Sequence, residues 1–102
     1  MSEKIYTIEE LKEKVGDVLS AFPVEKAILF GSYAQGLADE KSDIDLIVDS
    51  NGQLRGLKFF GLLETLTVAL KKDIDLIDQR DIIKNGEVDE EVSKTGVVIY
   101  GA

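Results

Sequence analysis

The sequence contains neither cysteine nor histidine. These two absences exclude disulfide bonds, thiolate chemistry, zinc sites and catalysis by an imidazole group. Any metal ion would therefore be held by oxygen atoms, a ligand set that favours magnesium, manganese or calcium.

Basic residues are also scarce. Lysine and arginine together number 12 against 20 aspartate and glutamate residues, which gives a formal net charge of −8. A protein that binds nucleic acid through its own surface needs positive charge to displace counterions from the phosphates. We therefore expect no direct contact with nucleic acid.

No long hydrophobic run is present. The most apolar stretch, residues 59–70, is interrupted by Glu64 and is too short to span a bilayer. Residues 1–4 lead into a charged segment and not into an apolar core, so we expect no signal peptide. The sequence predicts a cytoplasmic protein without membrane contact.

The 102 residues, of which 44% are hydrophobic, are enough for one domain with a single core, spanning residues 1–102. Residues 7–10 form a capping-box pattern, with Thr7 as N-cap and Glu10 three positions later. Apolar residues then recur at steps of three and four until Pro23, the only proline, ends the helix.

The remaining elements are predicted from apolar runs, helical periodicity and turn residues. They are a strand at 24–30, a short helix at 33–37, a strand at 43–49, a helix at 54–72, a strand at 73–78, a helical segment at 81–95 broken near residues 85–86, and a strand at 97–100. This order indicates an α/β fold with a mixed sheet of about four strands flanked by helices. The first two strands should be antiparallel because their link is short, and the long helix suits a parallel crossover to the third.

The five residues Asp-Ile-Asp-Leu-Ile occur twice, at 43–47 and at 73–77. Side chains alternate along a strand, so both acids of each copy point to one face. In the predicted topology both copies begin at the sheet edge where residues 31–32 end the first strand. Carboxylates gathered at one edge are costly unless a cation lies among them, and the repeat therefore predicts a divalent-metal site.

Gly31 and Ser32 complement these acids. A glycine at the end of a buried strand lets backbone N–H groups and the Ser32 hydroxyl approach phosphates closely. A Gly-Ser pair is more often a plain turn, and an Asp-x-Asp is more often solvated or capping than a metal ligand. Asp73 follows two lysines and fits a loop position better than a site. The combination at one edge is more specific than its parts, and it favours nucleotidyl transfer.

The segment Phe30-Gly31-Ser32, ten intervening residues and Asp43-Ile44-Asp45-Leu46 resembles the signature of the DNA polymerase beta-like nucleotidyltransferase superfamily. The small size, residues 31–36 and residues 96–100 are similar to its minimal nucleotidyltransferases (MNT), the antitoxin half of HEPN–MNT toxin–antitoxin pairs. The resemblance covers nearly all of the chain after residue 5 and implies a small nucleotidyltransferase fold.

This resemblance implies roles for individual residues. Gly31 and Ser32 would hold the nucleotide phosphates, and Asp43, Asp45 and Asp75 would be the catalytic acids that bind Mg²⁺, two ions in this family. AMP from ATP would pass to a hydroxyl of the partner HEPN toxin, such as the hydroxyl of a tyrosine. The chain departs from the family at Gln35, where an arginine is common, so the charge of that arginine is missing.

The 54–70 helix is apolar on more than one face. It is either a subunit interface, in a homo- or hetero-oligomer, or a helix whose second face is covered by the terminal segments. A non-catalytic antitoxin that neutralises its partner by direct contact is therefore the alternative function. A transferase subunit for a small molecule such as an aminoglycoside is less favoured, because the sequence has no acceptor domain.

Overall fold

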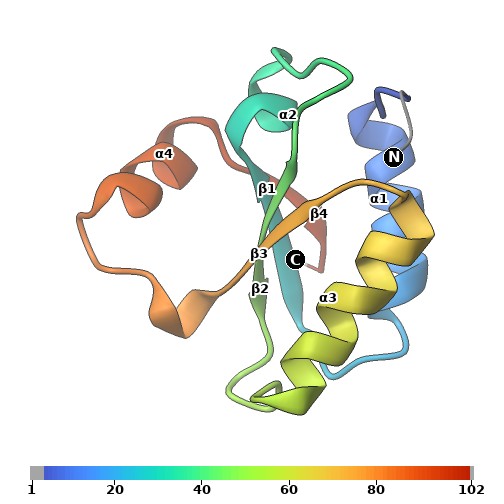
Figure 1. Ribbon diagram of the computed structural model, residues 1–102. Helices are drawn as coiled ribbons and strands as arrows, with labels where there is room; N and C mark the ends of the chain where they lie inside the picture. Colours follow the sequence, from blue (N-terminus) through green and yellow to red (C-terminus); the bar gives the residue numbers. More distant parts are fainter. Residues whose placement is uncertain (1–3, 102) are drawn as a thin grey trace.

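The structure, a computed structural model, describes residues 4–101. The elements follow in this order (Figure 1): α1 (Ile8–Leu19), β1 (Lys26–Phe30), α2 (Gly31–Gln35), β2 (Ile44–Asp49), α3 (Leu57–Leu70), β3 (Ile74–Asp78), the 3₁₀ helix η1 (Gln79–Asp81), α4 (Glu87–Thr95) and β4 (Val97–Tyr100).

The four strands form one sheet in the order β3-β2-β1-β4. β1 is antiparallel to both β2 and β4, whereas β2 and β3 are parallel. The 14 residues of α3 supply the crossover that a parallel pair requires, while the link from β1 to β2 holds only the five-residue α2. The predicted mixed sheet and its strand directions are confirmed.

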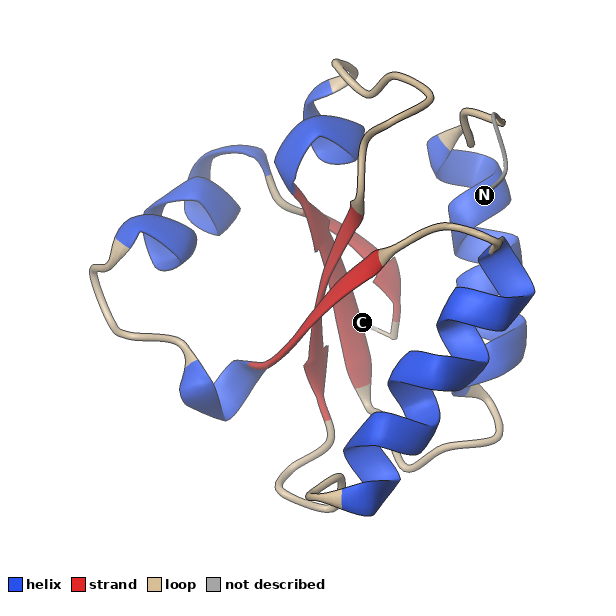
Figure 2. Ribbon diagram, viewed as in Figure 1, coloured by secondary structure: helices blue, strands red, loops and turns tan. Residues whose placement is uncertain are grey.

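Helices α1 and α3 lie side by side on one face of the sheet, and α4 lies on the other (Figure 2). The core between the sheet and α1 and α3 is built from apolar side chains at every second strand position and every fourth helix position. Its central members are Leu11, Val15, Leu19, Ala27, Leu29, Ile44, Leu46, Val48, Leu62, Leu66 and Leu70. Because these strand positions face α1 and α3, the intervening positions of β2 and β3 face the side of α4.

The start of α1 shows the predicted capping box. The Thr7 hydroxyl accepts the N–H of Glu10, and the Glu10 carboxylate accepts the N–H of Thr7, both at 3.0 Å. Just before this cap, the buried Tyr6 hydroxyl donates to the carbonyl of Leu70 at 2.7 Å. This bond ties the beginning of α1 to the end of α3, at the sheet edge where β3 begins.

The predicted boundaries of two helices were wrong by two or three residues. α2 begins directly after β1 at Gly31 and not at Tyr33. α3 begins at Leu57 and not at Leu54, because Gly56 precedes it with φ +55° and ψ −123°, a conformation open to glycine but not to a helix.

The segment predicted as helical over 81–95 contains less helix than expected. The carboxylate of Asp78 accepts the N–H of Arg80 at 2.9 Å and starts η1, which ends at Asp81. The chain then turns through Asn85, whose φ of +64° interrupts any helix, and α4 starts at Glu87. The predicted break near residues 85–86 is confirmed. Across residues 4–101, no helix has both the length and the apolar character needed to cross a membrane.

Candidate active site

The two Asp-Ile-Asp-Leu-Ile copies lie side by side in the sheet. The parallel register pairs Asp45 of β2 with Asp75 of β3. Neighbouring strands are about 4.8 Å apart, so the two carboxyl groups project next to each other from the same face. That face is the one opposite α1 and α3, at the edge of the sheet where both strands begin.

Gly31 brings the end of β1 to the same place. Phe30 is paired with Asp45 across the antiparallel β1–β2 ladder, and Gly31 follows it with φ +74°. A Cβ on Gly31 would collide with Oδ2 of Asp45 and lie 3.0 Å from its Cγ. The carboxyl group therefore rests directly on the bare Cα of Gly31, and both the backbone conformation and the close approach require glycine.

The environment of Asp45 opposes its ionisation. Burial, followed by the charges of Asp75, Asp43 and Glu91, raises the pKa of the Asp45 carboxyl to about 6. Carboxyl groups from both copies of the repeat thus act on one another electrostatically.

The other predicted site residues lie at the rim. Asp43 is exposed just before β2 begins, and Ser32 is half-buried in the first turn of α2. Asp73 is exposed and its carbonyl accepts the N–H of Ile44 at 3.0 Å, so it belongs to the connection before β3, as the sequence indicated.

Glu91 is a neighbour of the site that sequence reasoning missed. It lies on α4, which contacts α2, and its charge contributes to the raised pKa of Asp45. A hollow of about 320 Å³ separates the two helices, lined by Gln35, Glu87, Glu90, Glu91, Lys94 and Thr95. No spacing in the sequence links Glu91 to β2, because only the packing of α4 brings the two together.

Lys72 is a second missed residue. It is only 3% exposed, and its Nζ donates to the carbonyl of Glu40 at 2.7 Å. Glu40 lies in the loop between α2 and β2, which Asp39 closes by accepting the N–H of Lys41 at 2.9 Å. The buried ammonium group therefore fastens the loop before Asp43 to the corner before β3.

The carboxylate oxygens of these acids are the ligand type that a divalent cation prefers, although the acids do not converge on a common position. Among residues 4–101, no three acidic side chains converge closely enough to form a finished metal site. Asp43, Asp45 and Asp75 nevertheless supply only oxygen ligands, and their mutual repulsion is of the kind that a cation relieves. The donor atoms present fit a hard divalent metal such as Mg²⁺ or Mn²⁺.

A glycine-serine turn facing acids on two parallel strands, within this mixed sheet, defines a nucleotidyltransferase. The family described as Polymerase beta, Nucleotidyltransferase matches residues 13–102, and the chain belongs to that family. Members use a nucleotide substrate and typically a divalent metal.

Individual relatives indicate which nucleotidyltransferases this chain resembles. Protein adenylyltransferase MntA of Thermococcus cleftensis is 36% identical over 78 residues, covering 76% of this chain and 71% of that protein. A Methanocaldococcus jannaschii protein, provisionally named a protein adenylyltransferase, is 34% identical over 86 residues, covering 80% of this chain and all of that protein (100%). The fold matches a chain in a crystal structure of a toxin–antitoxin pair with AMP-PNP, with a TM-score of 0.77, 29% identity, and 89% of this chain and 73% of that one covered.

Proposed function

We propose that this chain transfers AMP from ATP to a hydroxyl group of a partner protein, as the antitoxin of a HEPN–MNT-type toxin–antitoxin pair. The observation that carries the proposal is the contact of Gly31 with Asp45, beside Asp75 on the next strand. Relatives named protein adenylyltransferases, and the fold match to a toxin–antitoxin pair holding an ATP analogue, support the choice of AMP and of a protein acceptor.

Asp43, Asp45 and Asp75 would hold Mg²⁺, with two ions as the family resemblance implies. When bound, the metal supplies positive charge that lets all three acids ionise and that balances the charge of a triphosphate. Gly31 presents no side chain at this edge, and the half-buried Ser32 follows it with a hydroxyl group, so the triphosphate can approach the backbone there. The acceptor oxygen forms a bond to the α-phosphorus, the bond to the β-phosphate oxygen breaks, and pyrophosphate leaves while the hydroxyl proton passes to a base.

Gln35 supplies no charge where the family often has arginine, but it shares its hollow with Lys94 of α4. Lys94 therefore brings an ammonium group to the hollow that Gln35 lines. We propose that Lys94 takes over part of the arginine's contact with anionic substrate.

The test combines the purified chain with labelled ATP, Mg²⁺ and the protein encoded by the adjacent gene. Wild type should transfer label to that protein. Asp45→Asn and Asp75→Ala should lower the rate by at least about a hundredfold, a loss typical for a residue that holds a catalytic metal. Asp73→Ala is the matched control. Asp73 is the other acid of the second copy of the repeat, and its removal should leave the rate within about twofold.

Two outcomes would contradict the proposal. One is transfer of no label by the wild-type chain, and the other is transfer that Asp45→Asn leaves unchanged. If Asp75→Ala still silences the partner without labelling it, the alternative of a non-catalytic antitoxin acting by contact is correct. The exposed apolar face of α3 is the observation that favours that alternative.

A further inference from the structure

The outer face of α3 carries an uncovered apolar stripe. Leu57, Phe60 and Val68 are 89%, 64% and 69% exposed, and none of residues 4–101 covers them. With Gly61 and Glu64 they lie within one side of the helix, and from end to end they span about 17 Å. We call these five residues the α3 stripe. Large aliphatic and aromatic side chains aligned on one helix face are typical of a docking surface.

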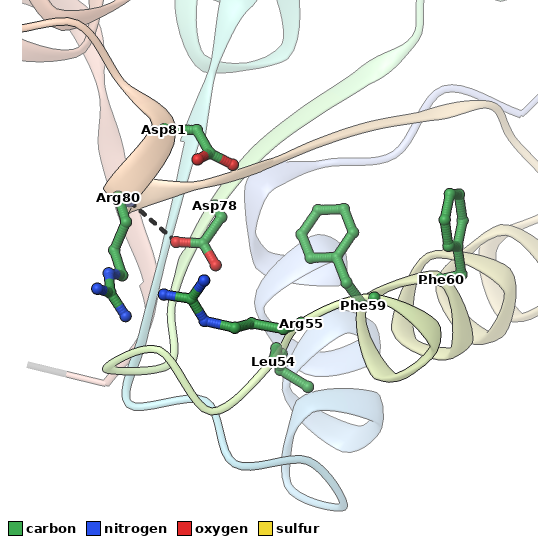
Figure 3. Close-up of a pocket in the computed structure, with 8 residues that line it drawn as sticks. Leu54, Arg55, Phe59, Phe60, Asp78, Arg80 and Asp81 are labelled. Carbon is green, nitrogen blue, oxygen red and sulfur yellow. Dashed lines mark hydrogen bonds between the residues drawn. The ribbon is translucent and has the colours of Figure 1, made fainter.

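A hollow with two arginines opens at the N-terminal end of this stripe (Figure 3). It measures about 280 Å³ and is lined by Leu54, Arg55, Gly56, Phe59, Phe60, Asp78, Arg80 and Asp81. Phe60 belongs to both features, so the hollow continues the stripe. Arg55 lies between β2 and α3, and Arg80 lies in η1 after β3. They are the only two arginines of the sequence, and both line this hollow.

Both guanidinium groups lie against the same glycine. A Cβ on Gly52 would collide with Nη1 of Arg80 and would lie 3.9 Å from Nη2 of Arg55. Two like charges beside the same glycine repel each other. Arg55 also donates from Nε to the carbonyl of Gly52 at 3.3 Å, which holds it in the hollow.

Neither arginine has an acidic partner within the described part of the chain, since the ion pairs found there involve only lysines. Asp78 and Asp81 both line the hollow, but neither forms an ion pair with an arginine, and the Asp78 carboxylate accepts the backbone N–H of Arg80 at 2.9 Å. The guanidinium forks are therefore open to a carboxylate, which arginine binds through two parallel hydrogen bonds.

We propose that the α3 stripe and the pair Arg55 and Arg80 form the docking surface for an amphipathic helix of the partner protein. The helix lays its apolar side along α3 and presents an aspartate or glutamate to the two arginines. A helix matches the length and straightness of the stripe and can supply a carboxylate at a fixed distance from its apolar residues. The inference rests on the proposed function, because the docked protein is the acceptor.

A second copy of this chain fits the surface poorly. Two chains of net charge −8 repel each other. If two α3 helices crossed antiparallel about the middle of the stripe, between positions 57 and 68, both Glu64 side chains would meet near the axis. The arginines at the ends of the two stripes would then have no acid opposite them.

The surface is placed so that a docked protein can also reach the acids. β3 is an edge strand, with α3 on one of its faces and the exposed Asp75 on the other. A partner lying along α3 extends from the arginines to the Val68 end of the helix, and from there it can pass around the edge strand β3 to bring a hydroxyl to the candidate active site.

The test measures the affinity of the chain for the adjacent-gene protein by calorimetry, without ATP, at low and at moderate salt. Phe60→Asp and the pair Arg55→Glu/Arg80→Glu should each weaken binding by at least about tenfold, as central interface residues do. The arginine pair should in addition reduce the salt dependence. Ile83→Asp, an equally exposed apolar residue elsewhere, and Lys14→Glu/Lys84→Glu are the matched controls and should stay within about twofold.

Each other result has a definite meaning. Absence of binding by wild type, or equal losses in test and control variants, overturns the docking proposal. A dimer of the isolated chain that Phe60→Asp dissociates, measured by light scattering, overturns it in favour of a second copy. AMP transfer is measured separately, so label on a partner bound elsewhere rejects the docking surface alone. Binding through the stripe without any label rejects the transfer function alone.

Discussion

Among single residues, Gly31 and Asp45 depend on each other more than the sequence suggests. Gly31 has a left-handed backbone conformation, and its missing side chain leaves the space that the Asp45 carboxyl occupies. Gly36 has the same φ of +74°, but no other atom lies within 4 Å of the Cβ it lacks. A side chain at Gly36 would meet only the cost of the backbone conformation, whereas a side chain at Gly31 would also collide with Asp45.

Gly31→Ala should lower the free energy of unfolding more than Gly36→Ala does. Each variant loses about 1 kcal/mol from the left-handed conformation, and Gly31→Ala loses about 1–3 kcal/mol more from overpacking against Asp45. Urea denaturation of the two variants measures the difference. In an Asp45→Ala background the difference should disappear, and its persistence there would contradict the contact.

Asp45→Asn should change how stability depends on pH in metal-free buffer with a chelator. The folded pKa of about 6 lies above the ordinary value of 3.8 for an aspartate, so the folded protein binds the proton more tightly than the unfolded chain. The free energy of unfolding of wild type therefore rises as the pH falls from about 6 to 4. Above pH 6 the ionised Asp45 carboxylate lowers it. Asparagine avoids this cost, so at pH 7.5 the variant should be more stable by about 1 kcal/mol, a figure reduced because the group is partly exposed.

The advantage of Asp45→Asn should vanish near pH 4, where both proteins are uncharged at this position. Thermal or urea unfolding across pH 4–8 measures this advantage. Asp73→Asn is the control, because Asp73 is an exposed acid in the other copy of the repeat. An advantage that grows toward low pH would show that Asp45 is stabilised as a carboxylate and would contradict the assigned environment.

Among the elements, the corner between α3 and β3 controls how the acid-bearing strands meet. Lys72 fixes the α2–β2 loop from this corner through the Glu40 carbonyl, and Ile44 donates to the Asp73 carbonyl at the start of both strands. These bonds join segments that are far apart in sequence. They set the separation of Asp43 from Asp75 before any ligand binds.

Lys72→Met should loosen the loop while leaving the apolar core in place. We expect amide hydrogen exchange at Lys41 and Ser42 to become at least about tenfold faster, and the Kd for Mn²⁺ to rise about tenfold, as for other residues that orient ligands. Lys71→Met is the matched control, because Lys71 is the neighbouring lysine and its side chain is exposed. Equal effects of the two variants would show that Lys72 does not position the acids.

Across the whole molecule, charge is distributed unevenly. Asp43, Asp45 and Asp75 lie where β2 and β3 begin, while the two arginines of the sequence meet at the opposite end of the sheet. Repulsion among the acids weakens the ligand-free fold, so a bound cation and nucleotide stabilise it by mass action.

Mg²⁺ together with a non-hydrolysable ATP analogue should therefore raise the Tm. At concentrations a hundred times the Kd, linkage gives about 2.7 kcal/mol, which corresponds to a shift of roughly 10 °C for a domain of this size. Asp75→Ala should remove most of the shift, whereas Asp73→Ala should retain it. A shift that survives in Asp75→Ala would place the metal and nucleotide elsewhere.

The sequence by itself determined the local features that depend on neighbouring residues. The capping box of α1, the strand alternation of the two repeats and the need for a crossover before β3 are consequences of spacing and chain length. They were enough to predict a mixed sheet with Gly31, Asp45 and Asp75 at one edge. Helix starts at α2 and α3 were misplaced because a glycine conformation, which no periodicity reveals, decides where each begins.

Only the tertiary structure decided which distant residues share that edge and which surface stays open. Glu91 acts on Asp45 because α4 packs against α2, and Lys72 donates to the carbonyl of Glu40, 32 residues earlier in the chain. The apolar sequence of α3 was compatible with burial on both sides, and the fold leaves its outer stripe uncovered among the described residues. Such contacts depend on how elements pack in three dimensions, and packing between distant segments leaves no regular spacing in the sequence.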